Sequence, residues 1–142
     1  MTDHRNLLEL EEAARQLFRK ISVSWSKFNE NGMTPVQGFL LERLEIEGPL
    51  KASQIADMLC YTPGAITTLS DKLIAAGLVE RERTDEDRRV VYLSITEAGR
   101  QMLGTIRLQR RANVENFFGD LADEDIQHLI RIFKEVVYKD KE

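Results

Sequence analysis

Cysteine is almost absent from this chain of 142 residues, in which Cys60 is the only one. A single cysteine excludes an intramolecular disulfide and leaves no plausible zinc cluster. The two histidines, His4 and His128, lie near opposite ends and form no local ligand motif. We therefore expect no metal and no cofactor. A lone cysteine at a helix end is more often a packing residue than a redox sensor.

Long apolar runs and catalytic motifs are also missing. No stretch approaches the ~18 apolar residues of a membrane span, and the N-terminus lacks the basic start and apolar stretch of a secretion signal. There is no glycine-rich phosphate loop and no Ser/His/Asp or Cys/His set at a sensible spacing. These absences predict a cytoplasmic protein that is not an enzyme and has no catalytic residues.

The net charge of −4 is unusual for a nucleic-acid binder, so its distribution matters more than its sum. Residues 60–111 carry nine Lys/Arg against seven Asp/Glu, a net charge of +2, whereas residues 1–59 and 112–142 have net charges of −2 and −4. Composition therefore permits DNA binding by the middle third of the chain without arguing for it.

Apolar residues recur three or four positions apart over most of the chain, which predicts helices. One stripe covers residues 7–28. A second helix starts at Thr34 and Pro35 and ends at Gly48 and Pro49, with Val36, Phe39, Leu40 and Leu44 expected on its buried face. A short third helix contains Ile55 and Leu59, a fourth runs from Thr62 to Gly77, a fifth begins at Thr96, and a last one covers roughly 123–138.

In two segments apolar and polar residues alternate, as they do in strands. Residues 78–83 and 90–95 are rich in Val, Tyr, Leu and Ile and are joined by the polar turn 84–87. Two short helices that meet across a tight turn, followed at once by a hairpin, form the layout of a winged helix-turn-helix. The predicted fold class is therefore mostly α with a small β wing (α+β).

The fourth helix has the chemistry of a DNA reader at its N-terminal end. Small side chains let the backbone lie deep in the major groove, and threonine offers a hydroxyl together with a methyl for thymine. A free helix N-terminus also suits a phosphate oxygen. On these residues alone, however, an ordinary solvated helix face is an equally good interpretation.

The hairpin adds arginines to this picture. Arg88 and Arg89 lie at its tip, where an arginine can enter the minor groove of A·T-rich DNA. Acids nearly match bases here, so a plain solvated hairpin is an alternative. A better use for the acids is orientation, because Asp87 can hold a neighbouring arginine so that its guanidinium points outward.

The segment from Thr62 through Leu78 and Val79, followed by the Asp-Arg-Arg sequence at 87–89 and Leu-x-Ile-Thr-x-x-Gly at 93–99, resembles the MarR family of multiple antibiotic resistance regulators. The resemblance extends over the whole chain, and its wing portion is the more specific part. It implies a triangular homodimer in which the first, fifth and sixth helices of two chains intertwine. It also implies a repressor, less often an activator, whose DNA affinity responds to a small phenolic or lipophilic ligand or to oxidation.

The resemblance assigns roles by position. Major-groove contacts fall on Pro63, Gly64, Ala65, Thr67 and Thr68, and Arg88 falls at the wing tip. Asp71 and Arg89 match a pair that ties the recognition helix to the wing. The full DNA-binding set that we expect is Thr62, Pro63, Gly64, Ala65, Thr67, Thr68, Lys72, Arg88 and Arg89. The chain departs from the family at Cys60, where glycine is usual, at Tyr61, where a small aliphatic residue is usual, and at Lys51, where a capping Thr or Ser is common.

We expect one MarR-like domain over 1–142, with a winged helix-turn-helix core at 34–99 and dimerisation helices in 1–33 and 100–142. The expected partners are a second copy of the chain, duplex DNA with a pseudo-palindromic operator, and a small aromatic or lipophilic effector. Trp25 and Phe28 are candidates for the effector pocket, although aromatic residues on such a stripe more often belong to a core or an interface. A winged-helix protein-interaction module that has lost DNA binding is the alternative function.

Overall fold

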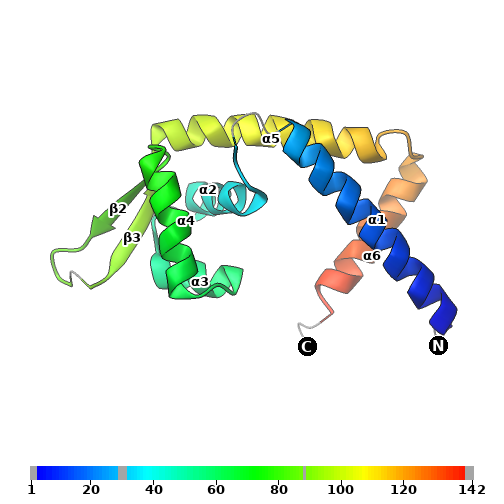
Figure 1. The fold of residues 1–142 in the computed structure, drawn as a ribbon, viewed down its shortest axis with the longest axis horizontal. Coiled ribbons are helices and arrows are strands. Elements are labelled where there is room, and N and C mark those ends of the chain that lie inside the picture. Colours follow the sequence, from blue (N-terminus) through cyan, green and yellow to red (C-terminus); the bar gives the residue numbers. More distant parts are fainter. Residues whose placement is uncertain (1–2, 29–31, 88, 140–142) are drawn as a thin grey trace. The chain divides into compact units, whose positions relative to one another are not determined.

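The computed structural model describes residues 3–28, 32–87 and 89–139, and the side chains of residues 27 and 28 lie outside this description. The chain divides into two compact units: a helical unit, Met1–Phe28 with Arg110–Glu142, and a winged unit, Asn29–Gln109. The elements in chain order are α1 (His4–Phe28), α2 (Pro35–Glu47), β1 (Leu50–Lys51), α3 (Ala52–Leu59), α4 (Pro63–Ala75), β2 (Val79–Arg83), β3 (Val91–Ile95), α5 (Glu97–Phe118) and α6 (Asp123–Val137) (Figure 1).

The winged unit packs three helices and the start of α5 against an antiparallel sheet of order β1-β3-β2. In the hairpin, Val79 lies opposite Ile95 and Arg81 lies opposite Leu93. This arrangement confirms the fold class, mostly α with a small β wing. The two-residue strand β1 pairs Leu50 with Leu93 and was not predicted, because two residues are too few to show alternation.

Side-chain caps fix where the helices of the winged unit begin. Thr34 Oγ1 accepts from the backbone N–H of Gln37 at 3.2 Å, while Gln37 Oε1 accepts from the N–H of Thr34 at 2.9 Å. Thr62 Oγ1 likewise accepts from the N–H of Ala65 at 3.2 Å. Each cap satisfies a donor that has no partner within its helix, and proline follows both threonines as the first helical residue. The predicted starts of α2 and α4 are therefore confirmed.

The start of α5 explains the Leu-x-Ile-Thr-x-x-Gly sequence. Thr96 Oγ1 accepts from the N–H of Gly99 at 3.0 Å and donates to the carbonyl of Gly77 at 2.7 Å. A Cβ at Gly99 would lie 2.2 Å from the carbonyl oxygen of Leu78, so only glycine fits at this position. The Thr96 hydroxyl thus caps α5 and also bonds it to Gly77, which lies two residues after the end of α4.

The core of the winged unit is aliphatic. Its most buried side chains are Leu40, Leu41, Leu44, Ile55, Ile66, Leu73, Val79, Leu93, Leu103 and Ile106. The expected burial of Phe39 is wrong: the side chain is 40% exposed, and Leu41 takes the inward place. Apolar and charged residues are intermixed around the whole circumference of α2, so its periodicity does not determine which face packs inward.

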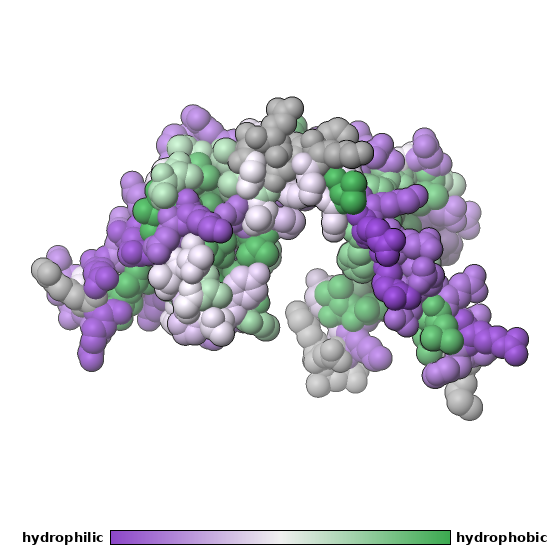
Figure 2. All heavy atoms as spheres, viewed as in Figure 1, coloured by the Kyte–Doolittle hydropathy of each residue, from purple (hydrophilic) through white to green (hydrophobic). Residues whose placement is uncertain are grey.

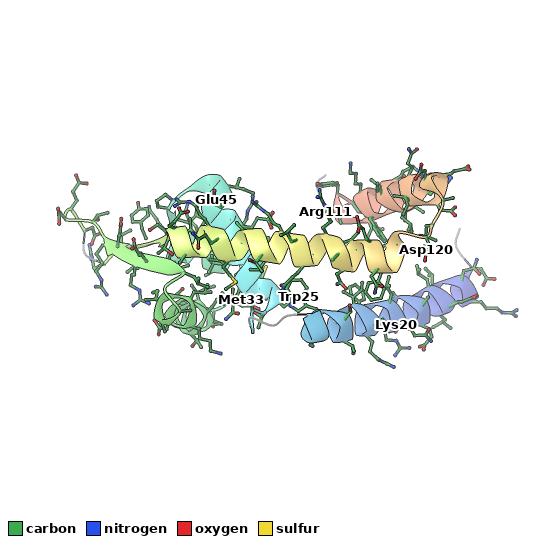
Figure 3. The ribbon with its side chains drawn as sticks, turned by 90° about the horizontal axis from the view of Figure 1, so that it is seen from above. Lys20, Trp25, Met33, Glu45, Arg111 and Asp120 are labelled. Carbon is green, nitrogen blue, oxygen red and sulfur yellow. The ribbon has the colours of Figure 1, made fainter. Side chains whose placement is uncertain are left out.

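Two ion pairs join α2 to the first half of α5. Arg100 Nε lies 2.9 Å from Glu45 Oε2, and Arg107 Nη2 lies 4.0 Å from Glu42 Oε1. Figure 3 labels Glu45 on α2 beside α5. Ile106 on α5 also packs against Gly38 on α2, where an added Cβ would lie 3.4 Å from Ile106 Cγ2. Arg100 and Arg107 on α5 are therefore both paired with carboxylates of the winged unit.

The helical unit contains α1, α6 and the second half of α5. Ser24 on α1 is buried and its hydroxyl donates to Asn113 Oδ1 on α5 at 2.6 Å. In Figure 3, α1 and α6 flank the end of α5 on its two sides. Within the described ranges, no helix combines the length and apolar character that crossing a bilayer requires.

Much of the apolar surface in the helical unit is uncovered, as the green spheres on α1 and α6 in Figure 2 show. The α6 helix has an apolar stripe but no buried residue. An open apolar groove of about 270 Å³ lies between α5 and α6, lined by Val114, Phe118, Ile126, Leu129, Ile130 and Phe133. Burying this surface requires another molecule or another part of the chain.

Candidate nucleic-acid interface

The exposed face of α4 consists of small residues. The residues of this helix and its cap that were predicted to contact DNA are all solvent-exposed: Thr62, Pro63, Gly64, Ala65, Thr67, Thr68 and Lys72. Ile66, Ser70 and Leu73 anchor the opposite side in the core. A Cβ at Gly64 would meet no atom within 4 Å, so the start of the helix is unobstructed. In Figure 2 this face is pale because its residues have intermediate hydropathy.

Both threonines on this face donate hydrogen bonds to their own helix. Thr67 Oγ1 lies 3.0 Å from the carbonyl oxygen of Pro63, and Thr68 Oγ1 lies 3.2 Å from that of Gly64. A carbonyl oxygen can only accept, so each hydroxyl supplies the proton. Both residues are solvent-exposed, and each hydroxyl oxygen keeps its lone pairs as acceptors.

The turn before α4 has an unusual backbone. Cys60 adopts the left-handed conformation with φ of 55°, and among the described residues no other non-glycine residue has positive φ. The N–H of Tyr61 donates to the carbonyl of Ala56 at 2.9 Å and closes the end of α3. This conformation explains why glycine is usual at this position in the family that the sequence resembles. At Lys51, Gln54 Oε1 accepts the backbone N–H at 2.9 Å, which provides half of a capping box.

The predicted salt bridge between Asp71 and Arg89 is wrong. Asp71 Oδ1 lies 2.7 Å from Arg81 Nη2 instead. Arg81 follows the buried Val79 by two positions on β2, so both side chains lie on the face of the strand that packs against α4. Arg89 lies beyond the hairpin turn, and its side chain is 92% exposed. Side chains alternate between the two faces of a strand, so the position of Arg81 two residues after Val79 could have indicated from the sequence that Arg81 faces α4.

The arginine at 89 is oriented by a neighbouring carboxylate, as expected of Asp87. Asp87 Oδ1 accepts from the backbone N–H of Arg89 at 3.0 Å and from its Nε at 3.1 Å. These bonds from Arg89, first through the side chain and then through the backbone, lower the pKa of the Asp87 carboxyl. Thr84 Oγ1 also donates to the carbonyl of Asp87 at 3.0 Å. The turn thus holds a guanidinium out toward solvent.

Three predicted residues remain untested by these contacts. Arg88 lies outside the described residues, and so does the side chain of Phe28. Trp25 is half-buried on α1. The effector pocket expected at Trp25 and Phe28 therefore stays a prediction.

A small pocket lies between α4 and the sheet within the winged unit. It has a volume of about 210 Å³ and is lined by Ala52, Ile66, Thr67, Ser70, Arg81, Arg83, Val91 and Leu93. Ser70 is buried.

Across the described part of the chain, no group of three or more His, Cys, Asp and Glu side chains is arranged to hold a metal ion.

The sequence profile of the MarR family matches residues 33–91. The HTH-type transcriptional repressor MdtR of Bacillus subtilis is 30% identical over 119 residues, which cover 83% of this chain and 77% of MdtR.

The fold is shared with proteins of known structure, among them the following two. A MarR family protein from Bacillus stearothermophilus superposes with a TM-score of 0.83 at 23% identity and covers 100% of both chains. FabT of Streptococcus pneumoniae, solved in complex with DNA, superposes with a TM-score of 0.77 at 21% identity and covers 92% of this chain and 94% of FabT.

Proposed function

Because this chain belongs to the MarR family of transcriptional regulators with a DNA-binding winged helix, we propose that it binds a pseudo-palindromic operator as a homodimer and represses transcription. MdtR, the relative at 30% identity, is named a repressor, which favours repression over activation. The core at 34–99 supplies the DNA surface in this proposal, while segments 1–33 and 100–142 supply dimerisation. A regulator of this kind works in the cytoplasm.

The observation that carries the proposal is the exposed, small-residue face of α4 beside the wing. Side chains no larger than threonine at Pro63, Gly64, Ala65, Thr67 and Thr68 allow the helix backbone to approach base edges closely. The wing holds Arg89 outward through its bonds to Asp87. A recognition helix in the major groove with a wing arginine at the backbone or minor groove fits these features. FabT has the same fold and was solved with DNA.

The uncovered apolar surface of the helical unit supports the homodimer. Its large exposed side chains include Leu7, Leu8, Leu10 and Phe18 on α1, and Ile130, Ile132, Phe133, Val136 and Val137 on α6. A second copy of the same unit offers the matching apolar surface, as an isologous interface requires. A two-fold dimer implies operator half-sites with centres about 10 bp apart.

The proposal includes release from DNA by a small aromatic or lipophilic effector. Membership in the family supports it, and Trp25 and Phe28 are the residues at which we place the pocket. A ligand that binds the DNA-incompetent form more tightly needs a coupling of only ~1–3 kcal/mol for a 5–150-fold loss of affinity. Titration of salicylate-like compounds into the protein–DNA complex tests this step, and indifference to them favours a constitutive regulator.

Retardation of random-sequence duplex at low salt tests the DNA-binding proposal. A DNA reader shows a non-specific background that weakens as salt rises, whereas an interaction module without DNA binding shows none. Arg88→Ala should weaken binding to all sequences and lower the salt slope by about one unit. Arg43→Ala, which removes an arginine paired with Glu47 on α2, is the control and should leave the slope unchanged.

A further inference from the structure

The hydroxyl protons of Thr67 and Thr68 are already used, and this limits which bases α4 can read. Each hydroxyl has one proton and two lone pairs. The protons go to the carbonyl oxygens of Pro63 and Gly64, at 3.0 and 3.2 Å. Such i→i−4 bonds are common for helical threonines, and here both occur on the exposed face of α4. Toward a ligand, both side chains therefore act as acceptors and carry a methyl group.

The base edges of the major groove differ in what they offer to an acceptor with a methyl. Adenine N6 and cytosine N4 donate hydrogen bonds, and thymine alone carries a C5 methyl. Guanine presents two acceptors, N7 and O6, and gives nothing to an oxygen whose proton is engaged. An A·T pair combines a donor and a methyl on one edge, whereas a G·C pair has a donor but no methyl.

Resting on the proposed function, we infer that Thr67 and Thr68 read A·T pairs. Their Oγ1 atoms accept from the N6 amine of adenine, and their methyl groups contact the methyl of thymine. Neighbouring residues reinforce this preference, because Pro63, Gly64 and Ala65 have no side-chain donor for guanine. The operator half-site should therefore contain A·T pairs where the N-terminal half of α4 enters the groove.

Selection from a random duplex pool, repeated with threonine variants, locates the base pairs involved. Thr67→Val and Thr68→Val remove the acceptor but keep the shape and the methyl group, and valine is β-branched as threonine is. Thr67→Ser and Thr68→Ser keep the acceptor and remove the methyl. We expect A·T pairs in the wild-type selection at the positions whose preference the valine variants change.

Base analogues in the selected duplex then separate the two contacts. Purine in place of adenine removes the N6 amine and should weaken wild-type binding about two- to tenfold, with no effect on the matching valine variant. Uracil in place of thymine removes the methyl and should weaken wild-type binding about fourfold, with a smaller effect on the matching serine variant.

Thr105→Val is the matched control. Thr105 is an exposed helical threonine whose Oγ1 donates to the carbonyl of Gln101 at 3.4 Å, but it lies on α5. This variant should select the wild-type sequence and keep both analogue effects.

Guanine at the positions that respond to the Thr67 and Thr68 variants would overturn the inference, and so would equal sensitivity to purine in wild type and valine variants. In both cases the protein still binds DNA, so the proposed function stands. Failure of the wild-type protein to enrich any sequence or to retard any duplex would instead overturn the proposed function.

Discussion

Cys60 carries a conformation that its side chain disfavours. Its φ of 55° lies in the left-handed region, where a Cβ crowds the following carbonyl. The N–H of Cys60 donates to Asp57 and that of Tyr61 donates to Ala56, so the bonds that end α3 hold the residue in place. The turn that sets α3 against α4 therefore stores strain at one residue.

Replacing Cys60 with glycine should relieve this strain. We expect Cys60→Gly to raise the free energy of unfolding by about 0.5–1 kcal/mol, since the left-handed cost exceeds the entropy that glycine adds to the unfolded chain. Cys60→Ala keeps the Cβ and should be nearly neutral. Urea unfolding of the three proteins provides the comparison, and equal stability of the glycine and alanine variants would count against strain.

The lowered pKa of Asp87 makes a second residue-level prediction. A carboxyl with a lowered folded pKa contributes stability above its unfolded pKa, and this contribution is lost as the pH falls through the lowered value. The Asp87–Arg89 pair should therefore persist at neutral pH and break only below about pH 4. Arg89→Ala should raise the Asp87 pKa toward that of an ordinary aspartate. Carboxyl NMR titration measures this shift, and an unmoved midpoint would contradict the pairing.

Residue types and local spacing predicted the exposed face of α4, but not every partner. The caps at Thr34 and Thr62 were predictable because a capping bond spans only three residues. The partner of Asp71 was not, because a sequence resemblance carries positions and not side-chain directions. Arg81 lies on the α4-facing side of β2, while Arg89 turns outward with Asp87.

At the scale of elements, two glycines on α5 have opposite roles. A Cβ at Gly99 would meet the carbonyl of Leu78 at 2.2 Å and Ile95 Cγ1 at 2.7 Å, whereas one at Gly104 would meet no atom within 4 Å. We expect Gly99→Ala to destabilise the fold by about 1–3 kcal/mol through overpacking. Gly104→Ala should stabilise it by about 0.5–1 kcal/mol, as alanine does inside a helix. Thermal unfolding of both variants checks the signs, and matching signs would refute the close approach.

The ion pair between Asp71 on α4 and Arg81 on β2 leads to a further prediction. Asp71 and Arg81 are both partly exposed, so their pair should contribute less than about 1 kcal/mol to stability. Its role is to orient β2 against α4, so Asp71→Asn and Arg81→Gln should each weaken DNA binding. A double-mutant cycle on DNA affinity measures the coupling. Additive losses would show that the two residues act independently.

The sequence was sufficient to predict where most helices and strands lie, but less sufficient to predict which of their faces pack inward. The hairpin strands agree with the predicted ranges to within one residue, because alternation and the polar turn at 84–87 agree. The strand β1 was missed, and the inward face of α2 was predicted correctly at Leu40 and Leu44 but wrongly at Phe39. The strand and the inward face both depend on tertiary packing: Leu50 pairs with β3, and Leu41 is buried in the core while Phe39 is 40% exposed.

At the scale of the whole molecule, the exposed apolar surface of the helical unit predicts that two copies of the chain associate. Phe133 on α6 is 52% exposed and borders the apolar groove between α5 and α6. Phe133→Glu should convert the dimer to a monomer, because a charge cannot be buried unpaired in an apolar interface. Phe39→Glu is the control, since Phe39 is an exposed aromatic residue of the winged unit. Sedimentation at micromolar concentration distinguishes them, and a wild-type monomer would refute the dimer.

Hydroxyl-radical footprinting on a selected operator tests the central claim, a homodimer that reads DNA with two α4 helices. The account predicts two protected half-sites with centres about 10 bp apart, occupied together by one dimer. Protection at both half-sites should be lost together in Phe133→Glu and retained in Phe39→Glu. A single protected site bound by one chain, or no protection by a protein that is folded and dimeric, would contradict the account.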